Sequence, residues 1–281
     1  SASYVVDAVM TGRYGTLKSV FVALPPAELQ RFSQRDDDWR GLAAFEMLSA
    51  GKRLFALDAE ASVAGQFGSG DSPQVSMNVA ARDALGTKSI KAALWPDKPA
   101  ITATKKFRLR NGSNDWARAH LRDQLSQRAA AGGPNLYGSS NTVAMFVNGR
   151  YYGMMDLRER EDETLAANNL GIDNDFIDDL DDPLLAGEDI NSGGDAALAS
   201  YTTFERHVTG NDMSVPANYN TVKAMIAPES LAWDWAHHMF HGNSDWPDRN
   251  VHVWRSPAYD GLWRWHPHDM DFAFGRYLGP E

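Results

Sequence analysis

The strongest constraint on the fold of this chain is an Asn-Gly turn set between two apolar runs. Residues 142–147 and 151–157 are rich in apolar, β-branched and aromatic side chains, and Asn148 and Gly149 lie between them. A two-residue type I′ turn needs positive φ at both central residues, which Asn and Gly adopt most readily. The segment therefore predicts an antiparallel β-hairpin, which any fold proposed for the chain must contain.

Other strands and helices are predicted on both sides of this hairpin. Strands are predicted over residues 19–24, 74–81, 89–94 and 105–110, with residues 74–94 forming a second hairpin. Helices are predicted over residues 25–32, 40–50, 116–131 and 228–240. The helix over residues 40–50 rests on the helical spacing of Leu42, Phe45 and Leu48, and Asp115 can cap the next one.

The order of these elements indicates an α+β fold rather than alternating βαβ units. No repeat of 20–50 residues is visible, which excludes solenoids and propellers. The length of 281 residues suits one large domain or two lobes. We expect two lobes that meet near residues 151–163.

Composition excludes several classes of protein. The chain has no cysteine, which rules out disulfides, thiolate zinc sites, iron–sulfur clusters and a cysteine nucleophile. Its 27 Lys and Arg against 37 Asp and Glu give a net charge of −10, which argues against a general nucleic-acid binder. No run of about 18 apolar residues predicts a membrane span, and the first residues lack the pattern of a signal peptide.

Two polar loops near the end of the chain carry the clearest chemical signal. Residues 241–250 precede an apolar strand over residues 251–254. Residues 263–265 form a matching strand, and residues 266–275 follow it as an Asp-rich loop. A hairpin of these strands would bring the two loops together. Carboxylate and amide oxygens on converging loops suit Mg²⁺ or Mn²⁺.

The spacing within the loops points to phosphoryl transfer. Asp245 and Asn250 have the Asp-x-x-x-x-Asn spacing of protein-kinase catalytic loops, where the Asp accepts the hydroxyl proton and the Asn holds a metal ion. Asp271 follows in the second loop, much as Asp-Phe-Gly follows a kinase catalytic loop. Asp245 and Asp248 are alternatively turn formers around Pro247. The gathering of several such residues on two adjoining loops favours function.

Histidines and other acidic residues are interpreted separately. His237 and His238 lie on a predicted helix and are interpreted as packing or surface residues. His266 and His268 could ligate a metal, although alternate strand residues share a face without being ligands. The acidic stretch over residues 173–182 lacks the Gly and Glu of an EF-hand loop and is interpreted as a solvated loop.

A kinase also needs a cation for the nucleotide phosphates. Lys88 follows a turn that starts at Arg82 and begins a predicted strand, which would place its ammonium on a rigid element. Lys91, Lys105 and Lys106 are alternatives of the same charge. Spacing alone does not decide among them.

Together these segments resemble the CotH kinase family of atypical protein kinases, first known from spore coats. The resemblance rests on segments in the family's order, namely residues 87–91, 107–116, 121–123, 147–153, 156–160, 243–250 and 265–275. It covers most of the chain from about residue 74 onward. His268 stands where the family commonly has an aromatic residue, and family domains usually continue further beyond the position of Asp271.

The resemblance implies a two-lobed atypical protein-kinase-like fold of the α+β class. Residues 1–157 would form the N-terminal nucleotide-binding lobe and residues 158–281 a C-terminal catalytic lobe that is truncated. The implied function is an atypical protein Ser/Thr kinase that transfers the ATP γ-phosphoryl group to a coat or secreted protein with Mg²⁺ or Mn²⁺. The implied location is secreted, cell-surface or spore-coat associated.

By that resemblance, the chain's site residues fall into three groups. The nucleotide-binding residues are Lys88, Arg82 and Glu159. The catalytic base is Asp245, with Asp248 close enough to compete for that role. The metal ligands are Asn250 and Asp271, with Asp269 supporting the metal or its loop.

Two other functions remain open from the sequence. A metal-dependent hydrolase would use His266, His268, Asp269 and Asp271 around a metal-generated hydroxide. A non-catalytic coat or adhesion module with a kinase-like fold would bind nucleotide without transferring phosphate.

Overall fold

The computed structural model describes residues 17–65, 72–183 and 189–275. By its internal contacts the chain divides into two compact units: Ser1–Leu121 with Ser139–Arg160, and Arg122–Gly138 with Glu161–Glu281. The strands are β1 (Lys18–Ala23), β2 (Arg40–Ser49), β3 (Lys52–Ala64), β4 (Ser76–Ala80), β5 (Lys106–Arg110), β6 (Ser140–Val147), β7 (Arg150–Glu159), β8 (Asp178–Asp181), β9 (Asp189–Ser192), β10 (His252–Arg255) and β11 (Arg264–His266). The helices are α2 (Pro26–Ser33), α3 (Arg122–Ala129), α4 (Glu163–Leu170), α5 (Gly194–Gly210), α6 (Pro216–Lys223) and α7 (Pro228–His241), with short 3₁₀ turns η1 (Asp83–Leu85), η2 (Ser113–Asp115), η3 (Asn174–Phe176) and η4 (Met270–Phe272).

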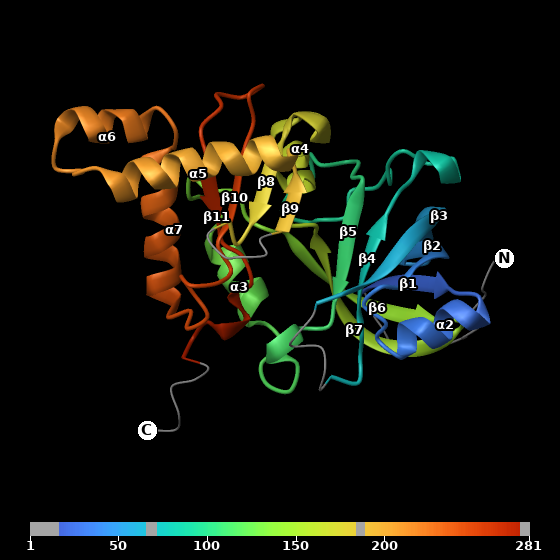
Figure 1. The fold of residues 1–281 in the computed structure, drawn as a ribbon. Helices are drawn as coiled ribbons and strands as arrows, with labels where there is room; N and C mark the ends of the chain where they lie inside the picture. The colour runs from blue at the N-terminus through green and yellow to red at the C-terminus, as the bar shows by residue number, and fades with distance from the viewer. Residues whose placement is uncertain (1–16, 66–71, 184–188, 276–281) are drawn as a thin grey trace. The chain divides into compact units, whose positions relative to one another are not determined.

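The first unit is a closed β-barrel in the strand order β1-β2-β3-β4-β5-β7-β6 (Figure 1). Every neighbouring pair is antiparallel except β1 and β6, which run parallel and close the barrel. Alternate side chains such as Val20, Phe45, Phe107 and Met145 fill one apolar core. Because side chains alternate between the faces of a strand, these residues point to the same side of the sheet.

The predicted Asn-Gly hairpin is confirmed. β6 and β7 pair in antiparallel register, and the turn residues Asn148 and Gly149 have φ of 47° and 78°. The Asn148 side chain accepts a hydrogen bond from the Leu24 amide at 2.8 Å and donates one to the Leu24 carbonyl at 2.9 Å. The turn is therefore also tied to the chain just beyond β1.

The helix predicted over residues 40–50 is wrong, because this segment is strand β2. Ala43, Phe45 and Met47 are buried in alternation, which is the period of a strand. Ala50 and Gly51 both have positive φ and turn the chain directly into β3. The apparent helical spacing came from apolar residues on both faces of this strand.

Two further predictions in the first unit need correction. Residues 89–94 do not form a strand: Ile90 makes a single bridge to Thr104, and β4 pairs with β3 and β5 instead. The helix predicted from residue 116 begins only at Arg122. The Asp115 carboxylate accepts hydrogen bonds from two loop amides ahead of that helix, so it shapes a loop rather than capping the helix.

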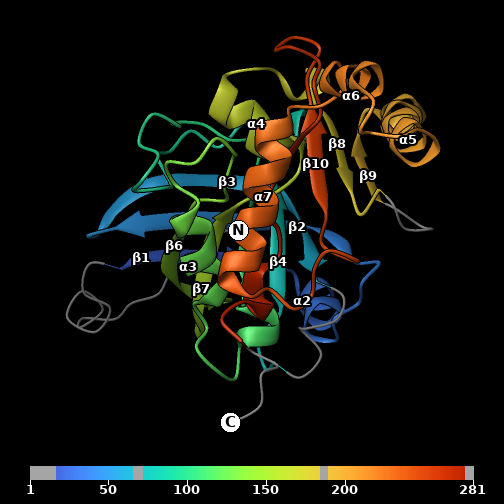
Figure 2. The ribbon, with the colours of Figure 1, turned by 90° about the vertical axis from the view of Figure 1, so that its left-hand side faces the viewer.

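The second unit contains an antiparallel sheet in the order β11-β10-β8-β9. Leu180, Val253 and Trp265 from three of its strands form an apolar core with Tyr201 and Phe204 of α5. Helix α7, which is seen from the side near the middle of Figure 2, contacts β11. The predicted β10–β11 hairpin is confirmed.

The expected two-lobed protein-kinase-like fold is wrong. The described residues instead form a closed seven-stranded barrel, a small separate sheet and six α-helices, of which α2 belongs to the barrel unit. Residues 40–64 supply two long strands in place of one helix, and the parallel pairing of β1 with β6 closes the sheet. The functional boundary between residues 157 and 158 stays a prediction.

No helix in the described parts of the chain has both the length and the apolar character needed to cross a bilayer.

Candidate functional site

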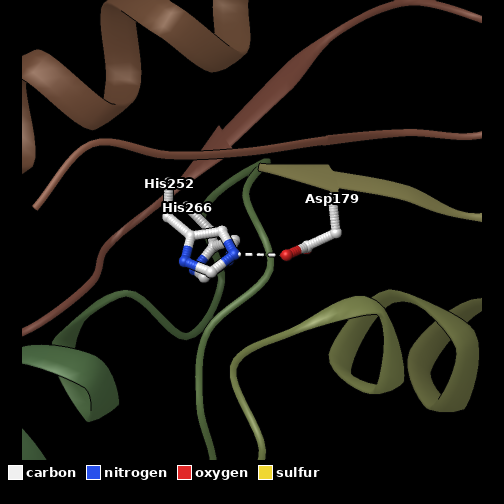
Figure 3. Close-up of side chains that lie close together, drawn as sticks. All are labelled: Asp179, His252 and His266. Carbon is white, nitrogen blue, oxygen red and sulfur yellow. Dashed lines mark hydrogen bonds and ion pairs between the residues drawn. The ribbon is translucent and has the colours of Figure 1, made fainter. Parts of the chain in front are cut away.

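A cluster of histidines and carboxylates occupies one face of the small sheet. His252 lies on the central strand β10, opposite Asp181 of β8 and His266 of β11. Residues opposite one another in antiparallel strands share a face, as do residues two apart in one strand. Asp179 therefore joins the same face, and Figure 3 shows its carboxylate pointing at the His252 imidazole.

Three members of the cluster are almost completely buried. Asp179, His252 and His266 each expose only 1% of their surface. Asp179 Oδ1 accepts hydrogen bonds from His252 Nε2 at 2.7 Å and from Asn191 Nδ2 at 2.8 Å. The imidazole rings of His252 and His266 lie with their centroids 4.4 Å apart. The second half of the stretch interpreted as a solvated acidic loop is thus a strand that carries a buried carboxylate.

The two histidines carry opposite pKa shifts. Burial lowers the pKa of His252, but attraction to the Asp179 carboxylate, its hydrogen bond and attraction to Asp181 together outweigh burial, so the pKa is raised overall. Burial, followed by repulsion from His252, lowers the pKa of His266 well below its usual range. His252 therefore favours the charged state and His266 the neutral one.

His268 continues the cluster beyond β11. Its Nδ1 lies 3.1 Å from Oε2 of the buried Glu161, and its ring centroid lies 4.8 Å from that of His252. Burial lowers the pKa of His268, but the Asp181 and Glu161 carboxylates outweigh burial and raise it to about 10. His268 thus provides a positive charge among these carboxylates.

The predicted catalytic residues Asp245 and Asn250 lie together. Asn250 Nδ2 donates to the Asp245 carbonyl at 3.0 Å and to Asp245 Oδ2 at 3.1 Å. Asn250 has a left-handed φ of 60°, which bends the chain between the loop and β10. Asp248 is exposed on the same loop.

The second predicted loop lies against the first. The Asn243 side chain contacts Met270 Sδ at 3.5 Å, and the Phe274 amide donates to the His241 carbonyl at 2.7 Å. Asp271 is fully buried and Asp269 is half-buried on either side of Met270. The prediction that the hairpin brings the two loops together is therefore confirmed.

The carboxylates of these loops do not form a three-ligand cluster. Within the described residues, two sets of His, Asp or Glu ligand atoms lie within 4.8 Å of one another: Asp179, His252 and His266, and Asp181, His252 and His268. Asp245, Asp269 and Asp271 belong to neither set. A magnesium site on these loops would need the Asn250 amide oxygen as a further ligand.

The predicted nucleotide-binding residues have different partners within the first unit. The Lys88 side chain is 84% exposed and lies 3.3 Å from Asp83. Arg82 pairs with Glu60 at 2.6 Å. Glu159 is buried, accepts a hydrogen bond from the Ser139 amide at 2.9 Å, and pairs with Lys98 at 2.6 Å.

Sequence interpretation missed three of these residues. Asp179 was hidden in an acidic run, and Lys98 carried no motif. His252 lies on a predicted strand, and no sequence motif marks it as a functional residue. The register of the predicted hairpin was the available signal for His252, because it sets this residue opposite His266.

Comparison with known proteins identifies a family. A family model described as CotH kinase protein matches residues 62–279, well over half of the chain. No curated protein gives a significant match.

Proposed function

The chain belongs to the CotH kinase protein family, and we propose that it is an ATP-dependent protein kinase that phosphorylates Ser or Thr. Family membership supports a kinase-like function. The observation that supports protein kinase activity in particular is the pair of hydrogen bonds from Asn250 Nδ2 to Asp245. They hold a carboxylate and an amide together at the spacing used by kinase catalytic loops.

Asp245 is proposed as the catalytic base. Its carboxylate accepts the proton of the substrate Ser or Thr hydroxyl while that oxygen bonds to the γ-phosphorus of ATP. The bond from the γ-phosphorus to the bridging oxygen breaks, and its electron pair leaves with ADP. Asp248, exposed on the same loop, is the competing candidate for the base.

The donor set of the two loops fits Mg²⁺ or Mn²⁺. Asn250 uses its Nδ2 toward Asp245, which leaves its amide oxygen as a ligand, and Asp271 offers a carboxylate. Hard cations prefer such oxygen ligands. Asp269 is proposed to support this pair. When bound, the ion would neutralise phosphate charge.

Roles in nucleotide binding are proposed for Lys88 and Arg82, by contact with the phosphates, and for Glu159, by positioning a neighbouring lysine. The exposed Lys88 ammonium and the Arg82 guanidinium carry the charge that phosphates need. Glu159 is buried against Lys98, so its proposed contribution is to hold that lysine in place. The proposed substrate is a Ser- or Thr-containing protein of a coat or of secreted material, in line with the family's association with the spore coat.

Intact mass spectrometry with ATP and Mg²⁺ or Mn²⁺ tests this function. We expect a Ser/Thr-rich acceptor protein to gain about 80 Da per phosphoryl group. Asp245→Asn should slow transfer by about 10²- to 10⁴-fold. Asn250→Ala and Asp271→Asn should raise the Mg²⁺ or Mn²⁺ concentration needed for transfer, while Asp37→Asn, at an exposed position, should change nothing.

Three outcomes would contradict the proposal. A nucleotide-sized adduct would indicate nucleotidyl transfer. ATP binding without any transfer would favour the non-catalytic module. Full activity in Asp245→Asn, with loss in Asp248→Asn, would move the base to Asp248.

A further inference from the structure

The small sheet has one apolar face and one face that buries ionisable side chains. One face carries Leu180, Val253 and Trp265, which pack on α5. The opposite face carries Asp179, His252 and His266, which are equally buried. Ionisable side chains are rarely buried unless they are paired or coordinate a metal. The hydrogen bond between Asp179 and His252 accounts for two of them and leaves His266 to be explained.

His266 has one nitrogen occupied and one without a hydrogen-bond partner. Its Nδ1 lies 3.1 Å from the Pro267 carbonyl, which can only accept, so Nδ1 carries the proton. Nε2 of the neutral ring then holds a lone pair. This atom is buried and has no hydrogen-bond partner. A metal-ligating histidine commonly has this arrangement, with the other nitrogen donating to a backbone carbonyl.

We propose that Asp179, His252 and His266 bind a borderline divalent transition-metal ion of the Zn²⁺ class. One ligand atom from each residue lies within 4.8 Å of the others, and the three side chains come from three adjacent strands (Figure 3). Two imidazole nitrogens and one carboxylate oxygen suit Zn²⁺ better than Mg²⁺, which prefers oxygen ligands. The site is separate from the oxygen-ligand site proposed above and does not depend on kinase activity.

The surrounding residues supply the second layer that such sites need. Asn191 Nδ2 donates to Asp179 Oδ1 and fixes the carboxylate. His252 Nδ1 faces Asp181 Oδ1 at 3.8 Å, so its Nε2 is the nitrogen directed at Asp179. Binding replaces the Nε2 proton of His252 by the ion and releases that proton to solvent.

The competing set of Asp181, His252 and His268 is less suitable. Nδ1 of His268 is engaged by Glu161 at 3.1 Å, and the Asp181 side chain is 29% exposed. His252 would serve that set through its other nitrogen. The unpartnered His266 nitrogen favours the first set.

The position of the site suggests what a bound ion would do. β10 begins two residues after Asn250, and β11 leads through His268 to Asp269. An ion held by β8, β10 and β11 would link β8 to the two strands, β10 and β11, that adjoin the polar loops. We infer a structural role that stabilises this sheet.

Titration of the full chain with ZnCl₂, followed by calorimetry and thermal unfolding, tests the site. We expect one equivalent of Zn²⁺ to bind and to raise Tm, and Co²⁺ to show visible d–d absorption when bound. His266→Gln and Asp179→Asn should each weaken Zn²⁺ affinity by about 100-fold or more, beyond the 10- to 100-fold typical of second-layer changes. His207→Gln, which removes a histidine of α5 outside the cluster, should bind as the unmodified chain does.

The outcomes separate this proposal from the alternatives. Far-UV circular dichroism and the Tm measured without metal first establish that each variant is folded. If His266→Gln does not fold, Asp179→Asn is used as the test variant. No binding to the unmodified chain, or unchanged affinity in both variants, would overturn the site. Loss in His268→Gln with full affinity in Asp179→Asn would overturn it in favour of the Asp181 set. Because the readout is Zn²⁺ binding, a failure of phosphoryl transfer leaves this result intact.

Discussion

Replacing Lys98 by methionine removes the cation from a buried ion pair in the first unit. Lys98 Nζ lies 2.6 Å from Glu159 Oε2, and the side chains are 9% and 0% exposed. At an effective dielectric constant of about 20, charges at this distance attract by about 6 kcal/mol. Desolvation of each ion costs several kcal/mol, so the pair itself adds little net stability.

The single substitution is nevertheless expected to be severe, because it leaves the Glu159 charge buried without its lysine. Removing one partner of a buried pair costs about 3–5 kcal/mol. That is a large share of the roughly 5–15 kcal/mol that stabilises a typical protein. The double variant Lys98→Met with Glu159→Gln should recover most of this loss, since the amide oxygen can still accept the Ser139 hydrogen bond.

Hydrogen–deuterium exchange resolved to β5 and β7 peptides measures this loss within the barrel. Exchange through opening should accelerate by about two to nearly four orders of magnitude in Lys98→Met. The control Lys52→Met removes an exposed lysine of β3 and should stay within about 0.5 kcal/mol. A change in Lys98→Met no larger than in this control, or a double variant no more stable than the single one, would refute the argument.

Two further predictions concern the second unit. Burial raises the pKa of Asp234 on α7 from 3.8 to about 8, so the folded chain keeps a proton that the unfolded chain has lost. This group makes the free energy of unfolding fall as pH rises from about 4 to 8, by at most about 1.4 kcal/mol per pH unit. When Tm is measured against pH, it should fall less steeply in Asp234→Asn than in the unmodified chain. Equal slopes would contradict the raised pKa of Asp234. A Cβ at Gly133 would overlap the Trp233 indole. Gly133→Ala should therefore cost about 1–3 kcal/mol by urea unfolding, whereas Gly210→Ala, at an open helical position, should be neutral or slightly stabilising.

Local chemistry explains which parts of the fold could be predicted. The Asn148 and Gly149 turn fixes its hairpin through the φ values it requires, so neighbouring residues were enough. Residues 40–49 carry apolar side chains on both faces, and their spacing fits a helix and a strand equally well. The pairing of β1 with β6 joins distant segments, and no local pattern indicates it.

The same distinction applies to the candidate site. The Asp245 and Asn250 spacing was visible because both residues lie on one loop, and His266 was visible on its strand. Asp179 became recognisable only when β8 paired with β10. An acidic run usually indicates a solvated surface, and pairing with neighbouring strands is what buries this one.

The parallel closure of the barrel also determines how the first unit must assemble. Lys18 pairs with Val143, so β1 has no partner on that side until β6 has been synthesised. Until then, the outer edges of the growing sheet expose backbone groups that can pair with other chains. Such long-range pairing slows folding, and the risk of aggregation is therefore concentrated in the period before β6 docks. Once closed, the barrel has no free edge, so the contact that makes folding slow also protects the folded barrel from edge-to-edge association.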